Sequence, residues 1–157
     1  SSFAGCAASG TAAGFDGNLT ALAAKIYENH KKVGLDVETT KMDLSDADMV
    51  SFNTGLSDLS KVSEVVISEP MTGSQPYSLV LVRAKDAADA ADLAKEMYDN
   101  INTRKWICVE ADTKTAAYCS DIALFFMINS EYADEATTDS ILDAFRASVS
   151  GDVTVVG

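Results

Sequence analysis

The clearest hydrophobic pattern in the chain lies between residues 101 and 129. Two short apolar segments there, 105–111 and 122–128, are bounded by Asp, Asn, Ser and Thr. Their β-branched and aromatic residues are typical of β-strands. Side chains alternate between the two faces of a strand, and both segments are apolar at consecutive positions, so neither face is expected to meet water. The pattern therefore predicts a sheet that is covered on both faces.

The rest of the chain supplies further strands and four helices. Extended structure is predicted for 62–69 and 77–84, which flank a loop with prolines and a glycine, and for the shorter segment 35–42. Apolar residues at three-and-four spacing predict helices. These run from Asp16 to before Gly34, from Ser45 to before Gly55, from Asp86 to Ile101, and over 133–149. Asp16, Ser45 and Asp86 carry side chains that can cap a first helical turn.

These elements predict an α+β domain, with an antiparallel sheet of four to five strands and about four helices packed on it. The chain of 157 residues is 47% hydrophobic, which is enough apolar material for one core. The order strand, strand, helix occurs twice, so we consider a pseudo-repeat of that unit. We expect residues 15–157 to form this single globular domain and residues 1–14 to precede it as a tether.

The first residues resemble the end of a bacterial lipoprotein signal peptide. The sequence begins Ser1-Ser2-Phe3-Ala4-Gly5-Cys6, with small residues at the two positions before the cysteine. Phe3 stands where leucine is usual. The run of Ala, Ser, Gly and Thr that follows Cys6 cannot build a core and suits a flexible tether. We expect Cys6 to carry the lipid and to hold the domain on the outer face of the cytoplasmic membrane; a disordered N-terminus without lipid is the alternative.

The charge of the chain narrows the class of partners. Lys and Arg total 12 against 24 Asp and Glu, a net charge of −12 at pH 7. Such a field repels nucleic-acid phosphates and anionic lipid headgroups. We therefore expect no nucleic-acid partner, and contact with a membrane through the lipid anchor only.

Residue types that carry catalysis or bind metals are sparse. His30 is the only histidine, and with two widely spaced cysteines it makes no zinc pattern. The acidic residues that begin at Asp43 lack the glycine and glutamate that an EF-hand needs at its sixth and twelfth positions. The Gly-x-Ser-x-Gly elbow of serine hydrolases is missing from the sequence. We therefore predict no metal, no cofactor and no catalytic residue, and we favour a binding protein over an enzyme.

Two arrangements are open for Cys108 and Cys119. A two-residue turn at 112–113 would place them diagonally on one face, about 7 Å apart and too far for an easy disulfide. A four-residue loop would place them opposite each other, where a disulfide can form. We expect buried free thiols, because free cysteine is commonly a core residue and the segments around both cysteines read as strand interior. A thiol nucleophile paired with His30 remains formally open.

Two segments offer side chains for a candidate interaction surface. An aromatic with a few polar groups on a restricted loop is a common contact site. The predicted surface residues are Glu69, Met71, Gln75 and Tyr77 around the first loop, and Arg104 and Trp106 in the second segment. The alternative is an ordinary hairpin loop next to a cationic helix end.

Three runs of sequence resemble a known family: Ser68-Glu69-Pro70-Met71, the segment 75–83, and above all Asn102-Thr103-Arg104-Lys105-Trp106-Ile107-Cys108-Val109-Glu110-Ala111. The chain is similar over most of its length, from about Ile26, to small uncharacterised predicted lipoproteins of Gram-positive gut anaerobes, a domain of unknown function. The resemblance implies an exported, lipid-anchored globular domain and carries no catalytic residues. We expect a binding or interaction module for a protein or a small molecule; a small envelope enzyme with a cleft near residues 69–77, or a structural envelope component, is the alternative.

Overall fold

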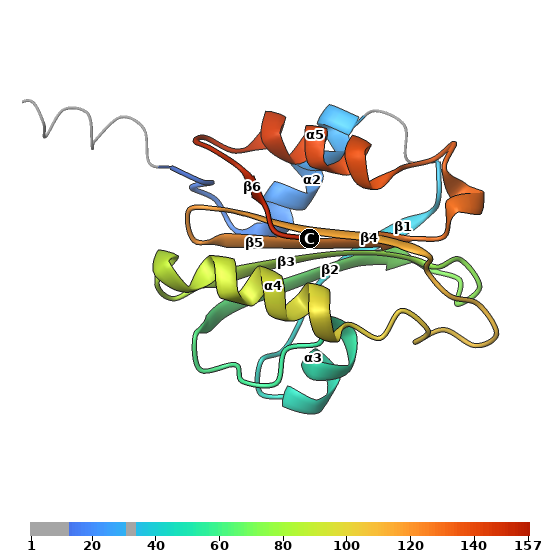
Figure 1. Cartoon of the computed structure of the whole chain (residues 1–157), viewed down its shortest axis with the longest axis horizontal. Helices are drawn as coiled ribbons and strands as arrows, with labels where there is room; N and C mark the ends of the chain where they lie inside the picture. Colours follow the sequence, from blue (N-terminus) through green and yellow to red (C-terminus); the bar gives the residue numbers. More distant parts are fainter. Residues whose placement is uncertain (1–12, 31–33) are drawn as a thin grey trace, which may run out of the picture.

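The structure is a computed structural model that describes residues 13–30 and 34–157 (Figure 1). Six strands form one antiparallel sheet in the order β1-β2-β3-β5-β4-β6. They are β1 (Val37–Lys41), β2 (Val62–Pro70), β3 (Tyr77–Ala84), β4 (Thr113–Cys119), β5 (Ile122–Ile128) and β6 (Thr154–Val155). The helices are α2 (Leu19–His30), α3 (Ala47–Thr54), α4 (Ala90–Asn100) and α5 (Thr138–Ser148), with short 3₁₀ turns η1 (Ala87–Asp89) and η2 (Ser130–Tyr132). The α+β class is confirmed.

The predicted count of four to five strands was too low. The sixth strand, β6, is only two residues long and exposed at both positions. Such a segment has no hydrophobic alternation, so its sequence carries no strand signal. It becomes a strand because Ala117 and Tyr118 of β4 lie beside it.

The sheet is covered on both faces, as its apolar strands predicted. Helices α2 and α5 pack together over one face, and α4 covers the other, with α3 beyond it (Figure 1). Successive residues of β3 divide between the two cores: Leu79 and Leu81 belong to the first, and Val80 and Val82 to the second. Every residue of β5 is buried, since this strand lies in the centre of the sheet.

The predicted strand at 105–111 was wrong. The strand that pairs with β5 on this side is β4, which follows residues 105–111 in the chain. A two-residue turn at Ser120 and Asp121 joins β4 to β5. Residues 101–112 form a loop instead, here called the 101–112 loop, in which Cys108 has a φ of 65°, outside the range of extended backbone. Strand propensity depends on burial and on neighbouring strands, and the segment that lies nearest to β5 along the chain pairs with it.

The strand, strand, helix order does occur twice, as β2-β3-α4 and β4-β5-α5. Because β3 and β5 are antiparallel neighbours, a twofold rotation that superposes the two units would have its axis perpendicular to the sheet. Such a rotation would place both helices on the same face of the sheet. Helices α4 and α5 pack on opposite faces. The two units therefore share an order of elements without being copies related by a rotation.

Helix starts differ from the predicted ones by a few residues. Asn18 caps α2, since its Oδ1 accepts a hydrogen bond from the amide of Ala21 at 2.8 Å. Asp46 caps α3, and Thr137 caps α5 in a capping box with Ser140. Several Asp, Ser and Asn residues stand near each helix start, and the backbone conformation selects which of them becomes the cap.

Cys6 and most of the predicted tether lie outside the described residues. At the start of the described chain, Gly14 already pairs with Ser150 through two backbone hydrogen bonds of 2.7 and 2.8 Å. Across the described ranges, no helix has the length and apolar character needed to cross a membrane.

Candidate functional site

The antiparallel strands give the sheet two distinct ends. The pairing of β3 with β5 runs from Tyr77 opposite Ile128 to Arg83 opposite Ile122, which separates the ends by roughly 20 Å. The N-terminal segment and the turn at 120–121 lie at the Arg83 end, here called the anchored end. The loop between β2 and β3 and the 101–112 loop lie at the other end, here called the loop end (Figure 1).

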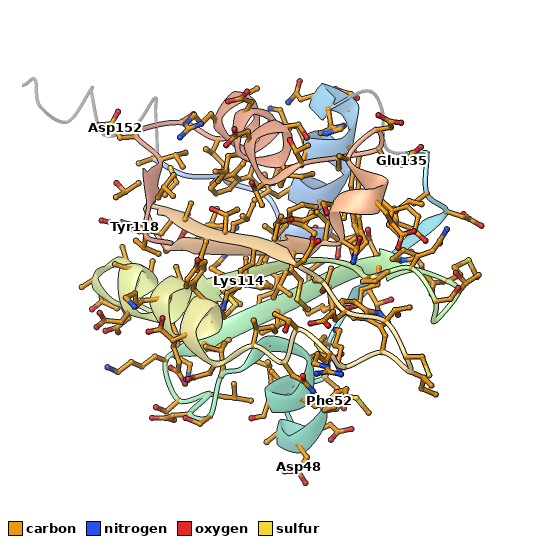
Figure 2. All side chains as sticks on the ribbon, turned by 45° about the vertical axis from the view of Figure 1, so that its right-hand side comes forward. Asp48, Phe52, Lys114, Tyr118, Glu135 and Asp152 are labelled. Atoms are coloured by element: carbon orange, nitrogen blue, oxygen red, sulfur yellow. The ribbon has the colours of Figure 1, made fainter. Side chains whose placement is uncertain are left out.

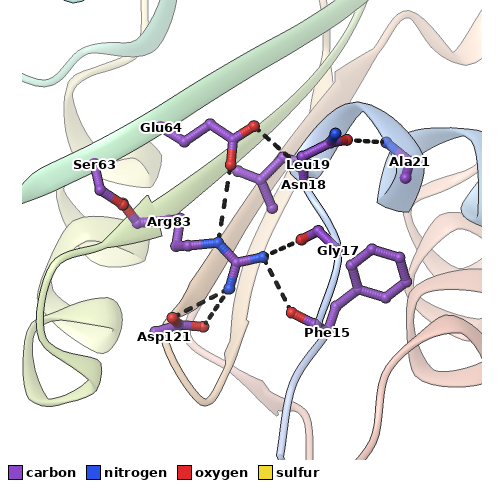
Figure 3. Close-up of polar contacts among 9 residues, drawn as sticks. All are labelled: Phe15, Gly17, Asn18, Leu19, Ala21, Ser63, Glu64, Arg83 and Asp121. Atoms are coloured by element: carbon purple, nitrogen blue, oxygen red, sulfur yellow. Dashed lines mark hydrogen bonds and ion pairs between the residues drawn. The ribbon is translucent and has the colours of Figure 1, made fainter.

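Arg83 fastens the N-terminal segment to the anchored end (Figure 3). Its guanidinium donates to both carboxylate oxygens of Asp121 at 3.0 and 3.1 Å, and to the carbonyl oxygens of Phe15 and Gly17 at 3.1 and 2.6 Å. Glu64 lies 3.9 Å from the Arg83 Nε and accepts a hydrogen bond from the amide of Leu19. One arginine therefore joins two strands, a turn and the approach to α2.

At the loop end, an ion pair brings together the two segments of the candidate interaction surface. The ammonium of Lys105 pairs with the carboxylate of Glu69, and it donates to Oδ1 of Asn53 in α3 at 2.9 Å. Only 3% of the Lys105 side chain is exposed. Burial lowers the pKa of Lys105, while Glu69 opposes that shift. Lys105, the first residue of the predicted strand, thus turns inward and holds the 101–112 loop against β2 and α3.

The six predicted surface residues do not all reach the surface. Tyr77 was wrongly placed there: it is fully buried, stacks edge-on against Phe126 with ring centroids 5.1 Å apart, and donates to the hydroxyl of Tyr27. It occupies the first position of β3, where side chains point into the core. Met71 is 67% exposed, and Gln75 lies within the loop, where it accepts a hydrogen bond from Thr72.

Arg104 and Trp106 line a pocket in the 101–112 loop. It has a volume of about 420 Å³, and its other lining residues are Cys108, Val109, Glu110, Asn129 and Glu131. Trp106 is half-buried and packs against the second core, with the ammonium of Lys105 5.4 Å from the centroid of its ring. The sequence offered little to identify Asn129 and Glu131, because they follow the end of β5 and reach the pocket only through the fold. Glu110 lay inside the wrongly predicted strand 105–111.

Hydrogen bonds fix the walls of this pocket to each other. Asn129 donates from its Nδ2 to the carbonyl of Glu110 at 2.9 Å and accepts from the amide of Glu131. Asp112 accepts two hydrogen bonds of 2.7 Å from the amide and hydroxyl of Ser130, and these hydrogen bonds lower its pKa. The end of β5 and the end of the loop therefore form one connected wall.

The pocket combines an aromatic ring with donors and acceptors of both charges. Among the residues that the structure describes, no cluster of His, Cys, Asp or Glu could hold a metal ion. The residues that line the pocket can bind a ligand through hydrogen bonds and through contact with the ring of Trp106.

Apolar side chains are also exposed near this end. Met49 and Phe52 of α3 are each 51% exposed, and Ile107 in the 101–112 loop is 85% exposed. Phe52 and Asp48 project outward from α3, while Lys114 and Tyr118 lie on the side of β4 that faces α4 (Figure 2).

The two described cysteines are free thiols, but only one is buried. Cys119 lies in β4 beneath the anchored end, where its Sγ is 3.3 Å from the carbonyl oxygen of Ser150, and burial raises its pKa. Cys108 is exposed, so the prediction of a buried strand position was wrong for it. Because the residues fall in a loop and in a strand, neither proposed hairpin geometry applies.

A second pocket, of about 380 Å³, lies between α2 and α5 and contains His30. The Nε2 atom of His30 is 2.7 Å from the hydroxyl of Ser140, and burial lowers its pKa. The Ser140 hydroxyl is also held by the amide and carbonyl of Thr137 in the capping box. The partner that the structure gives to His30 is thus a helix-cap serine rather than either cysteine.

No protein-family model, no curated protein and no solved structure matches the chain.

Proposed function

We propose that the protein is an exported lipoprotein that binds its ligand or partner at the loop end of the domain, away from the membrane. Cys6 carries the lipid in this proposal, and residues 7–12 connect it to the domain. The resemblance of the N-terminal residues to a lipoprotein signal supports export, and the pocket of Arg104 and Trp106 supports binding.

The observation that carries the proposal is the separation of the two ends. Arg83 and the Gly14–Ser150 pairing hold the N-terminal segment at the anchored end. The pocket opens at the loop end, on the far side of the central strands. A lipid on Cys6 would therefore leave the 101–112 loop accessible from outside the cell.

The 101–112 loop has the properties of a recognition loop on a rigid scaffold. It exposes Ile107 to solvent while the buried ion pair of Lys105 with Glu69 fixes its backbone. Loops that are held in one conformation lose less entropy on binding, and they carry a large share of binding sites.

Lipidation is tested by intact mass and membrane fractionation of the full-length protein in a Gram-positive host. The wild type should carry a diacylglyceryl mass and sediment with membranes, because the thiol of Cys6 is the acceptor. Cys6→Ser should lose that mass and be released or remain unprocessed. Cys108→Ser is the matched control and should be lipidated as the wild type is. A soluble wild type without lipid would overturn the proposed location.

Accessibility of the loop end is tested on the same cells with a maleimide that does not cross membranes. Cys108 should react in intact cells, because it is exposed at the loop end. Cells that express Cys108→Ser should show no reaction at the protein. Labelling only after lysis would contradict an outward-facing loop end.

A further inference from the structure

We propose that the pocket of Arg104, Trp106, Glu110, Asn129 and Glu131 binds an uncharged saccharide, with a pyranose ring against Trp106. This rests on the proposed binding function and adds the chemical class of the ligand. It does not depend on whether Cys6 is lipidated.

The shape of the ligand follows from the volume and the aromatic ring. A cavity of about 420 Å³ lies at the small end of the range for ligand sites and fits a monosaccharide or disaccharide. The C–H faces of a pyranose are apolar, and they pack against an aromatic side chain while the hydroxyls remain at the edges. Trp106 is the only tryptophan of the chain, and its packing on the second core fixes the ring in place.

The hydroxyl groups of the sugar need both donors and acceptors. The guanidinium of Arg104 presents several donors in one plane, and the carboxylates of Glu110 and Glu131 are acceptors. Within the described ranges, the Arg104 side chain makes no ion pair. Its donors are therefore available to a pair of neighbouring hydroxyls, and hydrogen bonds to charged groups are the stronger ones.

The charge of the site disfavours an anionic ligand. One arginine faces two glutamates in the lining, and the whole chain has a net charge of −12. An acidic sugar or a phosphate would be repelled by this field, because it would meet more carboxylates than cations. Lys105 does not change the net charge around the pocket, since Glu69 neutralises it.

The walls are preorganised for such a ligand. Asn129 links Glu110 to Glu131, Asp112 holds Ser130, and Lys105 ties the base of the loop to β2. A saccharide binds weakly when a site must order itself first, because each ordered side chain costs free energy. Here those hydrogen bonds are already formed in the unbound protein.

The test is a titration of the Cys6→Ser protein with defined saccharides, followed by the fluorescence of Trp106 and by calorimetry. The panel contains oligosaccharides of glucose, of mannose and of N-acetylglucosamine, with an oligogalacturonate as the acidic arm and a glucosamine oligomer as the cationic arm. We expect at least one uncharged oligosaccharide to bind with saturation below about 10 mM. It should also slow the alkylation of Cys108, which lines the same pocket.

Substitutions of the pocket residues test whether the saccharide binds at this site. Arg104→Ala, at an exposed position, should weaken binding about tenfold or more, which corresponds to the loss of a charged hydrogen bond. Trp106→Leu, followed by calorimetry, should abolish binding. Arg146→Ala, on the exposed face of α5, is the matched control and should bind as the parent protein does.

Three outcomes would overturn the saccharide assignment: no uncharged sugar binds, binding is unaffected by Arg104→Ala, or one of the two charged arms binds most tightly. If the wild type is lipidated but no uncharged saccharide binds, the proposed location is retained and only the proposed ligand class is rejected. Saccharide binding by a protein that is not lipidated would overturn the location and leave the ligand class standing.

Discussion

Lys105 illustrates, at the scale of single residues, how a charge is retained inside a fold. Its side chain is 3% exposed, and Glu69, whose side chain is 25% exposed, neutralises it. Removing one member of such a pair leaves a buried charge without compensation. Glu69→Gln should therefore lower the free energy of unfolding by about 1–3 kcal/mol, as measured by urea denaturation.

The control for this prediction is a double-mutant cycle with Lys105→Met. Methionine fills a similar volume without charge, so the double variant should be less destabilised than the sum of the two single variants. The exposed pair of Lys95 with Asp99 serves as a comparison, and Lys95→Met should change stability by no more than about 0.5 kcal/mol. Additive effects at Glu69 and Lys105 would contradict a coupled pair.

His30 gives a pH dependence at the same scale. Burial lowers its pKa from 6.5, so below that pH the unfolded chain binds a proton more readily than the folded one. The unfolded state then holds more protons, and stability falls as the pH is lowered through 6.5 toward the folded pKa. Thermal denaturation between about pH 7.5 and pH 5.5 should show this fall, and His30→Gln should reduce it.

The same titration can be followed directly, because His30 is the only histidine. Its NMR resonances should give a midpoint below 6.5 in the folded protein. A midpoint at or above that value would contradict the burial of the ring beside Ser140.

At the scale of elements, Gly55 ends α3 and allows it to pack against the end of α4. Its φ is 81°, and a Cβ there would lie 2.8 Å from the backbone carbon of Asn100 and 2.8 Å from the amide nitrogen of Ile101. Gly55→Ala should therefore cost about 2–4 kcal/mol in the free energy of unfolding, from the left-handed backbone and the clash together. Gly73→Ala is the matched control: no atom lies within 4 Å of its Cβ, and stability should change by less than about 0.5 kcal/mol.

Arg83 connects elements that are distant along the chain. Lysine in its place cannot reach Asp121 and the carbonyls of Phe15 and Gly17 together, because it lacks the planar fork of donors. Arg83→Lys should lower stability by about 1–3 kcal/mol, and the amide of Leu19 should exchange faster with deuterium.

The exposed Arg146 provides the control for Arg83. It pairs with Asp143 on the surface of α5, and 47% of its side chain is exposed. Arg146→Lys should change stability by less than about 0.5 kcal/mol. Equal effects at both arginines would show that Arg83 does not anchor the N-terminal segment.

At the scale of the whole molecule, the net charge of −12 opposes the compact state. Raising the ionic strength from about 0.01 M to 0.15 M shortens the screening length from about 30 Å to 8 Å. We expect stability to rise by about 1 kcal/mol, or roughly 2–4 °C in the midpoint of thermal unfolding. The effect should shrink near pH 4.3, where the chain is neutral, and a fall in Tm with salt at pH 7 would contradict it.

The fold was largely predictable, and the candidate site only in part. Strands β3 and β5 were predicted at their observed bounds, because their apolar residues record burial on two faces. Arg104 and Trp106 were predicted at a binding surface and line the pocket. Tyr77 was misplaced, since an aromatic at the edge of a loop has the same local signature as an aromatic at the start of a buried strand.

The sequence by itself determined the α+β class, the covered sheet and the positions of its helices. These properties follow from the local period of apolar residues, which each segment carries alone. Only the tertiary structure decided that 101–112 is a loop, that Lys105 turns inward to Glu69, and that Glu110 and Glu131 share a pocket. These contacts join residues that are far apart in the chain, and their free energy depends on which surfaces meet, which no single segment specifies.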